Sequence, residues 1–418
     1  MRILFLTENF PPERNASATR VYERACYWVK WGHEVTVLTC TPNFPEGKVF
    51  PGYRNKWHQV EMMDGIRVVR VKTFITANEG IVLRTLDFLS FMGSAMIAGL
   101  FQDPPDVIIS TSPQFFAAVG GWGLAGLRGK PFIFELGDLW PASITAVGAM
   151  EQNVFLRWME RLELFLYRRS AAVIALTSAF KDDLVRRCIP PGKIAVVING
   201  VDTPRYAPRP RDMELAKTYG LDEHFVIGYI GTHGMAHALE KVLDVAEKLQ
   251  QMPDVRFLFV GGGAGKVKLE EELGKRKLRN VVLVPPQPKE RMPEFWSLCS
   301  VALVHLKDTP VFEAVIPSKI FEAMGMGVPI LLASPKGEAS HIVEKEEAGL
   351  WVPAEDPTAL EEGILRLKND HEFYHLCAAR SYASAPRYSR ERQARDVLKV
   401  AMEVVKGNGG AVGIGESA

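Results

Sequence analysis

The sequence predicts an α/β protein with two doubly wound domains, each a parallel sheet covered by helices on both faces. Short apolar runs rich in β-branched residues alternate with helical stretches, which is typical of such sheets. The alternation stops in a segment rich in proline and arginine, 199–212, and then starts again. The length of 418 residues also exceeds what one hydrophobic core usually supports. We therefore expect domains over 1–198 and 213–386, joined by a linker over 199–212.

The expected strands follow in chain order. In the first domain they are 2–7, 33–39, 66–71, 106–110, 131–136, 172–177 and 194–199. In the second domain they are 225–231, 255–263, 281–285, 301–305, 329–333 and 349–353. A last helix over 387–406 follows Pro386 and is expected to pack back on the first domain. The glycine-rich tail 407–418 is expected to be flexible.

The composition narrows the class of protein. Fifty basic and 49 acidic residues give a net charge of +1, which argues against nucleic acid as a partner. The five cysteines are scattered and never stand in CxxC spacing, which is typical of free thiols in a reducing compartment. The first residues lead directly into a strand without a leader sequence, so we expect a cytoplasmic protein.

Two stretches leave a choice between a packed helix and a membrane surface. Residues 88–101 are fourteen residues without a charge, too few to span a bilayer. They fit a core helix, or a helix at the cytoplasmic face of the inner membrane. In 151–169 arginines alternate with Phe, Trp and Leu. That pattern fits an ordinary amphipathic helix as well as one that lies on an anionic bilayer.

The loops that leave strands hold the candidate site residues, because ligands of open parallel sheets bind beyond the carboxyl ends of the strands. The loop 231–240 joins a strand to a helix through a glycine turn, which presents backbone N–H groups and a helix dipole to an anion. Two further loops, 8–20 and 135–141, leave strands of the first domain. The acidic and basic side chains of 8–20 either touch an acceptor or a phosphate, or form surface salt bridges. Candidates from these three loops are Glu8, Arg14, Arg20, Glu135, Asp138, Gly231, Thr232, His233, Gly234 and His237.

Residues 311–329 hold two glutamates nine positions apart, Glu313 and Glu322. On one helix they would lie on opposite faces. Pro317 favours a helix that begins beside it, because proline fits the first turn and keeps the preceding residue extended. Glu313 is then expected in a loop, from which the two carboxylates converge. Ser318 and Lys319 lie at the expected helix start, where Lys319 adds positive charge toward a phosphate.

Two motif matches carry little weight, and a third pattern is missing. HEFYH over 371–375 satisfies HExxH, but no third ligand follows it, and a solvated helix is the simpler interpretation. GGGAG over 261–265 lacks the GxGxxG register of a dinucleotide site. No aspartate lies two residues from another, so the DxD pattern that binds a metal with a nucleotide diphosphate is missing. We expect neither a metal nor another cofactor.

The chain resembles glycosyltransferase family 4 over nearly its whole length. Within the family it is similar to the bacterial subgroup that builds O-antigen, capsule and exopolysaccharide units, including proposed fucosamine transferases. The resemblance implies the GT-B fold, in which two Rossmann-like domains face a cleft. The motifs that carry it are NFPPE (9–13), GHEVTVLT (32–39), PNFPEGK (42–48), DLWP (138–141), NGVD (199–202), PSKIFEAMGMGVPI (317–330) and GLWVPAEDPTAL (349–360).

The resemblance implies a retaining, metal-independent enzyme that binds a nucleotide-sugar mainly through its second domain and the acceptor through its first. The family signature is two glutamates with seven residues between them. The second, which Glu322 matches, binds the ribose hydroxyls. The first, which touches the donor sugar, falls on Ala314 in this chain, so Glu313 stands one position early.

Two further departures from the family concern phosphate binding. Many relatives carry an arginine and a lysine in the glycine turn that opens the second domain, whereas this chain has His233 and His237 there. Lys319 is then the nearest permanent cation in the motifs, beside the backbone N–H groups of 232–234. In the first loop, a glycine pair common in relatives becomes Asn15-Ala16-Ser17.

The loop 135–141 resembles the strand end where other relatives carry a functional histidine. Asp138 and Glu135 are therefore candidates to orient the acceptor hydroxyl or to stabilise positive charge at the anomeric carbon. The alternatives are a helix N-cap for Asp138 and an ion pair with a basic residue for Glu135.

These inferences predict a hexosyl- or N-acetylhexosaminyl-type glycosyltransferase of surface polysaccharide synthesis. The donor is a nucleotide diphosphate sugar, for which the subgroup resemblance suggests UDP and an N-acetylated deoxyhexosamine. The acceptor is a hydroxyl of a polyprenyl-diphosphate-linked saccharide. Retention without an enzyme nucleophile implies front-face attack assisted by the leaving phosphate. The alternatives are a sugar-nucleotide epimerase of the same fold and a non-catalytic protein that binds nucleotide-sugars.

Overall fold

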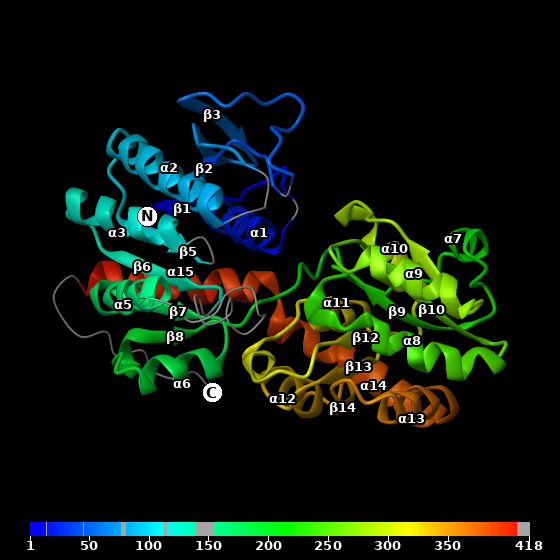
Figure 1. Ribbon diagram of the computed structural model, residues 1–418. Helices are drawn as coiled ribbons and strands as arrows, with labels where there is room; N and C mark the ends of the chain where they lie inside the picture. Colours follow the sequence, from blue (N-terminus) through cyan, green and yellow to red (C-terminus); the bar gives the residue numbers. More distant parts are fainter. Residues whose placement is uncertain (14, 45, 77–80, 113–114, 139–153, 408–418) are drawn as a thin grey trace. The chain divides into compact units, whose positions relative to one another are not determined.

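The computed structural model describes residues 1–418 except 14, 45, 77–80, 113–114, 139–153 and 408–418. Its contacts divide the chain into two compact units (Figure 1). The first holds Met1–Ile198 and the chain from Arg390 onward, and the second is Asn199–Ser389. The segment 199–212, which we expected as a linker, lies in the second unit. There the backbone of Tyr206 packs so closely on Gly325 that a Cβ on that glycine would lie 2.7 Å from the Tyr206 carbonyl oxygen.

The first unit is built on an eight-stranded sheet within the described residues, in the order β3-β4-β2-β1-β5-β6-β7-β8. Its neighbours are parallel except β3 and β4, which form an antiparallel hairpin. The strands are β1 (Arg2–Leu6), β2 (Glu34–Cys40), β3 (His58–Met63), β4 (Ile66–Val71), β5 (Val107–Thr111), β6 (Phe132–Leu136), β7 (Ala172–Ala175) and β8 (Ile194–Val196).

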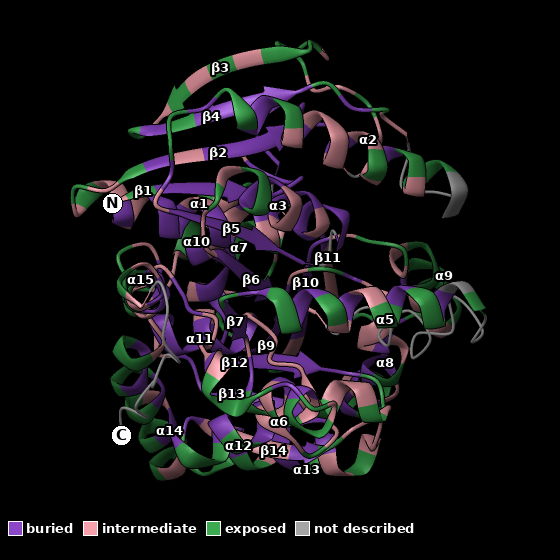
Figure 2. Ribbon diagram, turned by 90° about the vertical axis from the view of Figure 1, so that its left-hand side faces the viewer, coloured by how far each residue is buried: buried purple, intermediate pink, exposed green. Residues whose placement is uncertain are grey.

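The edge strand β3 was not among the expected strands. Its residues alternate between exposed and half-buried, and Figure 2 shows it in green and pink where the neighbouring strands are mostly purple. The turn into β4 is Asp64-Gly65, both with positive φ. Asp-Gly between two strand-like runs is a strong hairpin signal, so the sequence did contain the information.

Helices cover the first sheet. They are α1 (Ala16–Lys30), α2 (Ile81–Leu100), α3 (Phe115–Arg128), α5 (Val154–Arg169), α6 (Ser178–Arg186), the short η1 (Pro191–Lys193) and the C-terminal α15 (Arg390–Lys406). The last of these packs on α1, where the Trp28 indole Nε1 donates a 2.8 Å hydrogen bond to the Ala394 carbonyl. Arg390 of α15 also pairs with Glu23 of α1 at 3.0 Å.

The second unit holds a six-stranded, wholly parallel sheet in the order β11-β10-β9-β12-β13-β14. The strands are β9 (Phe225–Ile230), β10 (Val255–Val260), β11 (Val281–Val284), β12 (Val301–His305), β13 (Ile330–Ser334) and β14 (Gly349–Pro353). Around them lie α7 (Met213–Thr218), η2 (Met235–His237), α8 (Leu239–Lys248), η3 (Leu249–Gln251), α9 (Lys266–Arg276), η4 (Lys289–Arg291), α10 (Met292–Leu298), η5 (Pro310–Ala314), α11 (Lys319–Met326), α12 (Glu338–Lys345), α13 (Pro357–Asn369), α14 (His371–Ser384) and η6 (Ala385–Tyr388).

The strand order of the second sheet fixes where a ligand binds. The chain begins at β9, adds β10 and β11 on one side, and then crosses to add β12 on the other side. Loops that leave β9 and β12 therefore diverge at this switch point and leave a crevice at the carboxyl ends of the strands. HExxH lies elsewhere, at the start of α14, where His371 and His375 are exposed.

Candidate active site

The glycine turn after β9 is held by the glycine-rich segment after β10. The His233 N–H donates a 2.8 Å hydrogen bond to the Gly262 carbonyl, and the Gly265 N–H donates one of 2.8 Å to the His233 carbonyl. A Cβ on Gly261, where φ is +149°, would lie 1.9 Å from the Gly231 carbonyl oxygen. The glycines of GGGAG are therefore needed because the backbone of this segment packs against the backbone of the turn after β9. This packing accounts for the partial motif, and no bound dinucleotide is needed to explain it.

Lys319 extends from the first turn of α11 to this glycine turn. A Cβ on Gly231 would lie 3.0 Å from the Lys319 Nζ, so the ammonium lies directly against the turn. The Nζ donates a 3.1 Å hydrogen bond to the Tyr229 hydroxyl and lies 4.4 Å from the centroid of that ring. The Tyr229 hydroxyl in turn donates to the Thr232 carbonyl at 2.8 Å.

Burial of the Lys319 ammonium lowers its pKa to about 8, although the Glu322 carboxylate opposes the shift. The side chain therefore remains mostly protonated at neutral pH and carries an incompletely solvated charge. A buried ammonium of this kind binds an anion more strongly than a solvated one, because little of its hydration remains to be lost.

His233 is nearly fully buried at 1% exposure, and neither ring nitrogen has a hydrogen-bond partner among the described residues. Burial, with the nearby Lys319 and Lys266 charges, lowers the pKa of this histidine to about 4. Buried polar atoms are nearly always paired. A neutral imidazole that offers one donor and one acceptor beside Lys319 is therefore suited to a polar ligand.

His237 has a structural partner. Its Nδ1 lies 3.2 Å from the His305 carbonyl oxygen, and the His305 Nδ1 lies 2.8 Å from the His237 carbonyl oxygen. Burial lowers the pKa of His237 to about 3 and also lowers that of His305. The two neutral rings join the turn after β9 to the end of β12, so His237 fixes the switch point of the sheet.

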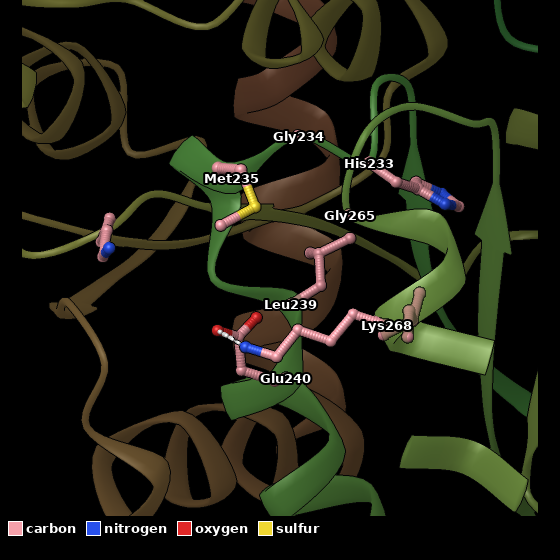
Figure 3. Close-up of a pocket in the computed structure, with 9 residues that line it drawn as sticks. His233, Gly234, Met235, Leu239, Glu240, Gly265 and Lys268 are labelled. Carbon is pink, nitrogen blue, oxygen red and sulfur yellow. Dashed lines mark hydrogen bonds and ion pairs between the residues drawn. The ribbon is translucent and has the colours of Figure 1, made fainter. Parts of the chain in front are cut away.

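A small pocket lies beside His233 between α8 and α9 (Figure 3). The volume open to a water-sized molecule in it is about 30 Å³. Lys268 of α9 reaches Glu240 of α8 at 3.3 Å across this pocket, and the His233 ring points away from it. The Lys268–Glu240 pair thus joins α8 to α9 beside the glycine turn.

Glu322 is half-buried in the first turn of α11. The indole Nε1 of Trp296, a fully buried residue of α10, donates a 3.1 Å hydrogen bond to its Oε2. An oriented carboxylate at the start of a helix can accept two hydrogen bonds from a vicinal diol such as ribose. Trp296 was missing from the sequence-based candidates, because only the packing of α10 on α11 brings it to Glu322.

Glu313 and Glu322 lie on different elements, as Pro317 predicted. Glu313 is exposed in η5, and α11 begins at Lys319 with Ser318 as its N-cap residue. The Ser318 side chain makes no capping hydrogen bond, and its carbonyl accepts from the Glu322 N–H at 3.2 Å. A Cβ on Gly337 would lie 2.1 Å from the Glu313 carbonyl oxygen, so the η5 backbone is held in place while its glutamate side chain faces solvent.

In the first unit, Glu135 is fully buried at the end of β6 and pairs with two arginines of α1. Its Oε1 lies 3.0 Å from the Arg20 Nε, and its Oε2 contacts the Arg24 guanidinium. Burial raises the pKa of this carboxyl, but the Arg24 and Arg20 charges outweigh it and the net pKa is lowered. Of the two interpretations of Glu135, ion pairing is the one that the contacts support. Arg20 is likewise buried rather than a surface residue.

Asp138 follows β6 in a turn that Ser112 holds. The Ser112 Oγ accepts from the Gly137 N–H at 2.8 Å and from the Asp138 N–H at 3.4 Å. The side chain of Asp138 is half-buried. The N-cap interpretation concerns the residues after it, which begin at 139 and lie outside the described residues.

The opening loop of the first unit is also ordered by side chains. Asn15 caps α1, since its Oδ1 accepts from the Ala18 N–H at 2.8 Å, and Ala16 and Ser17 form the first turn of that helix. Glu13, of the NFPPE motif, accepts a 2.8 Å hydrogen bond from the Asn43 N–H and so holds the loop of the PNFPEGK motif. Arg14 lies outside the described residues.

Glu8 lies buried just after β1. Burial raises its pKa well above the ordinary value, and the neighbouring Asp87 and Glu13 carboxylates add to the effect. Asp87 of α2 has its own pKa raised to about 7, again chiefly by burial. Burial therefore makes both carboxyl groups hold their protons to a higher pH than exposed carboxylates do.

The fold defines a class of protein. Two Rossmann-like units, each built on a mainly parallel sheet, are the architecture of the GT-B fold. Residues 17–205 match the family model described as Glycosyltransferase Family 4, and residues 214–384 match the model described as Glycosyl transferases group 1. The chain belongs to glycosyltransferase family 4, which confirms the expected fold and family.

Named relatives and solved structures agree with this assignment. The putative colanic acid biosynthesis glycosyl transferase WcaI of Escherichia coli is 25% identical, over 78% of this chain and 82% of that protein. A GDP-mannose-dependent alpha-mannosyltransferase of Mycobacterium tuberculosis is 24% identical, over 91% and 92%. Anabaena HepE in complex with UDP-glucose superposes with a TM-score of 0.72 at 18% identity, over 96% of this chain and 99% of that one. Sucrose-phosphate synthase of Thermosynechococcus elongatus superposes at 0.78 with 18% identity, over 97% and 99%.

Proposed function

We propose that this glycosyltransferase is a retaining enzyme that moves a hexose-type sugar from a nucleotide diphosphate to a hydroxyl of a polyprenyl-diphosphate-linked saccharide. The observation that carries the proposal is the position of Lys319 and Glu322 on one side of α11, with Lys319 against the Gly231 turn. The names of the relatives, among them a putative colanic acid biosynthesis enzyme, support a role in surface polysaccharide synthesis. Neither an epimerase nor a non-catalytic binder is favoured by those names.

The donor is assigned to the second unit. Glu322 accepts hydrogen bonds from the ribose hydroxyls, and Trp296 holds its carboxylate for them. Lys319, His233 and the N–H groups of the glycine turn bind the diphosphate, since this turn lies at the switch point where phosphates bind in such sheets. UDP is the proposed base because HepE was solved with UDP and with UDP-glucose. The mannosyltransferase relatives use GDP-mannose by name, so GDP is the competing base.

The chemistry follows from the charges. The bond between the anomeric carbon and the diphosphate oxygen breaks, and the acceptor oxygen bonds to that carbon from the same face. The acceptor proton passes to the departing diphosphate. Lys319 stabilises the negative charge that develops on the leaving group, and a preorganised buried cation does so without solvent reorganisation. Asp138 is proposed to orient the acceptor on the first unit.

The test is a transfer assay. Purified protein is offered UDP-, GDP- and dTDP-sugars, each with and without a polyprenyl-diphosphate-sugar, and nucleotide release and product are measured. Acceptor-dependent release supports the proposal. Sugar interconversion without an acceptor would instead identify an epimerase, and donor binding without turnover would identify a non-catalytic protein.

Calorimetry tests the ribose assignment separately. Glu322→Ala is expected to weaken nucleotide-sugar binding at least tenfold, because a charged acceptor contributes about 1.5–3 kcal/mol. The control is Glu372→Ala, which removes an exposed carboxylate of α14. Unchanged binding by Glu322→Ala would refute the ribose assignment while leaving the transfer reaction open to the first test.

A further inference from the structure

Three helices lie side by side over one face of the first sheet, in the order α2, α3, α5 (Figure 1). Glycines bring α2 and α3 close together. A Cβ on Gly99 of α2 would lie 2.3 Å from a methyl carbon of Leu124, and one on Gly123 of α3 would lie 2.9 Å from the Met96 methyl carbon. The Trp122 ring of α3 meets the Phe165 ring of α5 at 5.1 Å. The outward sides of the three helices therefore belong to one surface.

The outward side of α2 is apolar. At 100° per residue, its large exposed hydrophobic residues fall within an arc of about 120°. They are Leu83, Leu86, Leu89, Ile97, Leu100 and, directly after the helix, Phe101. The opposite side is packed, since Phe91 and Ala95 are fully buried. Exposed patches of this kind on soluble proteins usually mark a contact with another molecule or a membrane.

The outward side of α5 combines aromatic and basic residues. Val154, Trp158 and Phe165 are exposed at 83%, 54% and 36%. Interleaved with them on the same side of the helix are exposed arginines: Arg157, Arg161, Arg168 and Arg169. This arrangement joins apolar surface to a dense positive charge.

The acidic residues of α5 lie away from that side. Glu160 and Glu163 both pair with Arg187, which follows α6, at 3.1 and 3.2 Å. A single arginine outside the helix therefore holds both carboxylates. The outward side of α5 presents its arginines without an acidic residue of its own among them.

We propose that the outward sides of α2 and α5 form one docking surface for an anionic phospholipid bilayer. Positive charge beside Trp, Phe and Leu is the composition of helices that lie flat in the headgroup region of anionic membranes. An uncharged protein surface would not pair with the arginines, and a nucleic acid would not bury the leucines.

A membrane span is a different claim, and the packing of α2 argues against it. Among the described residues, Leu83–Leu100 is long and apolar enough to cross a bilayer, and 22% of that stretch is buried inside the protein. Its inner side nevertheless packs on α3, β2 and β4. A helix held along one side by its own fold can touch a membrane only with the other side.

The experiment is vesicle co-sedimentation of the full chain. Vesicles of phosphatidylcholine mixed with phosphatidylglycerol are compared with vesicles of phosphatidylcholine alone, at low and high salt. We expect binding to the anionic vesicles that salt weakens. Arg157→Ala combined with Arg161→Ala should lower the partition coefficient on the order of 30-fold, because each basic residue near an anionic surface contributes about 1 kcal/mol, or about fivefold. Lys399→Ala with Lys406→Ala on α15 is the matched control.

A second pair of variants tests the apolar part of the surface. Ile97→Ser with Phe101→Ser replaces side chains that are 62% and 82% exposed, so folding should be unaffected, and a matching thermal unfolding curve checks this. Weaker vesicle binding is expected, whereas the control pair Val267→Ser with Leu376→Ser in the second unit should bind normally. Equal binding to neutral vesicles, no effect of the arginine variants, or self-association through this surface in sedimentation velocity would each overturn the proposal. None of these measurements depends on the transfer reaction.

Discussion

Replacing Lys319 by methionine tests the central feature of the donor site. The side chain lies 8% exposed against the Gly231 turn, and burial lowers its pKa to about 8. A charge-assisted hydrogen bond from this ammonium to a diphosphate contributes about 1.5–3 kcal/mol. Lys319→Met should therefore weaken UDP binding at pH 7 by about 10- to 150-fold. Methionine fills a similar volume, so the protein should fold normally.

The same pKa predicts how binding depends on pH. With a pKa of about 8, about nine-tenths of Lys319 is protonated at pH 7 and about one-tenth at pH 9. A diphosphate binds the protonated form, so affinity falls as pH rises through this pKa, by about tenfold between pH 7 and pH 9. The neighbouring His233 and His237 stay neutral throughout that range, because their pKa values are about 4 and 3. Tyr229 stays neutral as well, since burial raises its pKa well above 10.0.

The assay is calorimetric titration of UDP at pH 7 and pH 9 with the wild type, Lys319→Met and the control Lys217→Met, which changes an exposed lysine of α7. Comparison between variants cancels the titration of the nucleotide itself. The wild type and the control should lose about tenfold more affinity than Lys319→Met over this range. An equal loss in all three proteins, or unchanged affinity of Lys319→Met at pH 7, would refute the assignment of Lys319 to the diphosphate.

Three further predictions follow from the packing. Trp296→Phe removes the donor of the 3.1 Å bond to Glu322, and calorimetry should show donor affinity about fivefold lower; unchanged affinity would mean that the indole does not position the carboxylate. Glu135→Gln leaves two buried arginines without their carboxylate, so urea denaturation should show a loss of about 3–5 kcal/mol. The pKa of Glu135 is lowered from 4.5, so the stability that its charge contributes is present above pH 4.5 and is lost as the pH falls through the lowered pKa. The wild type should therefore lose more stability on acidification than Glu135→Gln does. Equal losses in the two proteins would contradict this. Gly261→Ala places a Cβ 1.9 Å from the Gly231 carbonyl oxygen, so it should lower both the thermal unfolding temperature and the affinity for UDP. An unfolding curve like that of the wild type would show that the turns at Gly231 and Gly261 can separate.

Much of the fold could be predicted because it depends on local pattern. Parallel strands buried on both faces produce continuous apolar runs, and the runs at 2–7 and 225–231 became β1 (Arg2–Leu6) and β9 (Phe225–Ile230). The run at 255–263 ended early, at Val260, because Gly261 leaves the strand with φ of +149°. The half-exposed edge strand β3 escaped notice because it has no continuous apolar run.

The sequence by itself determined the α/β class, the family resemblance, and the break between Glu313 and Glu322, since Pro317 acts on its own neighbours. Only the tertiary structure decided which side chains meet. It joined Trp296 to Glu322 and Lys319 to Tyr229, pairs 26 and 90 residues apart in the chain. No local pattern encodes such contacts, because they arise where strands and helices pack across the sheet.

The same reason accounts for Glu135. Its position at a strand end suggested chemistry, yet Arg24, which lies 111 residues earlier on α1, binds its carboxylate in the core. A strand end shows only that a side chain lies near the carboxyl edge of the sheet. Whether that side chain faces a ligand or a buried arginine depends on which helix covers it, and that is settled by the packing of the whole unit.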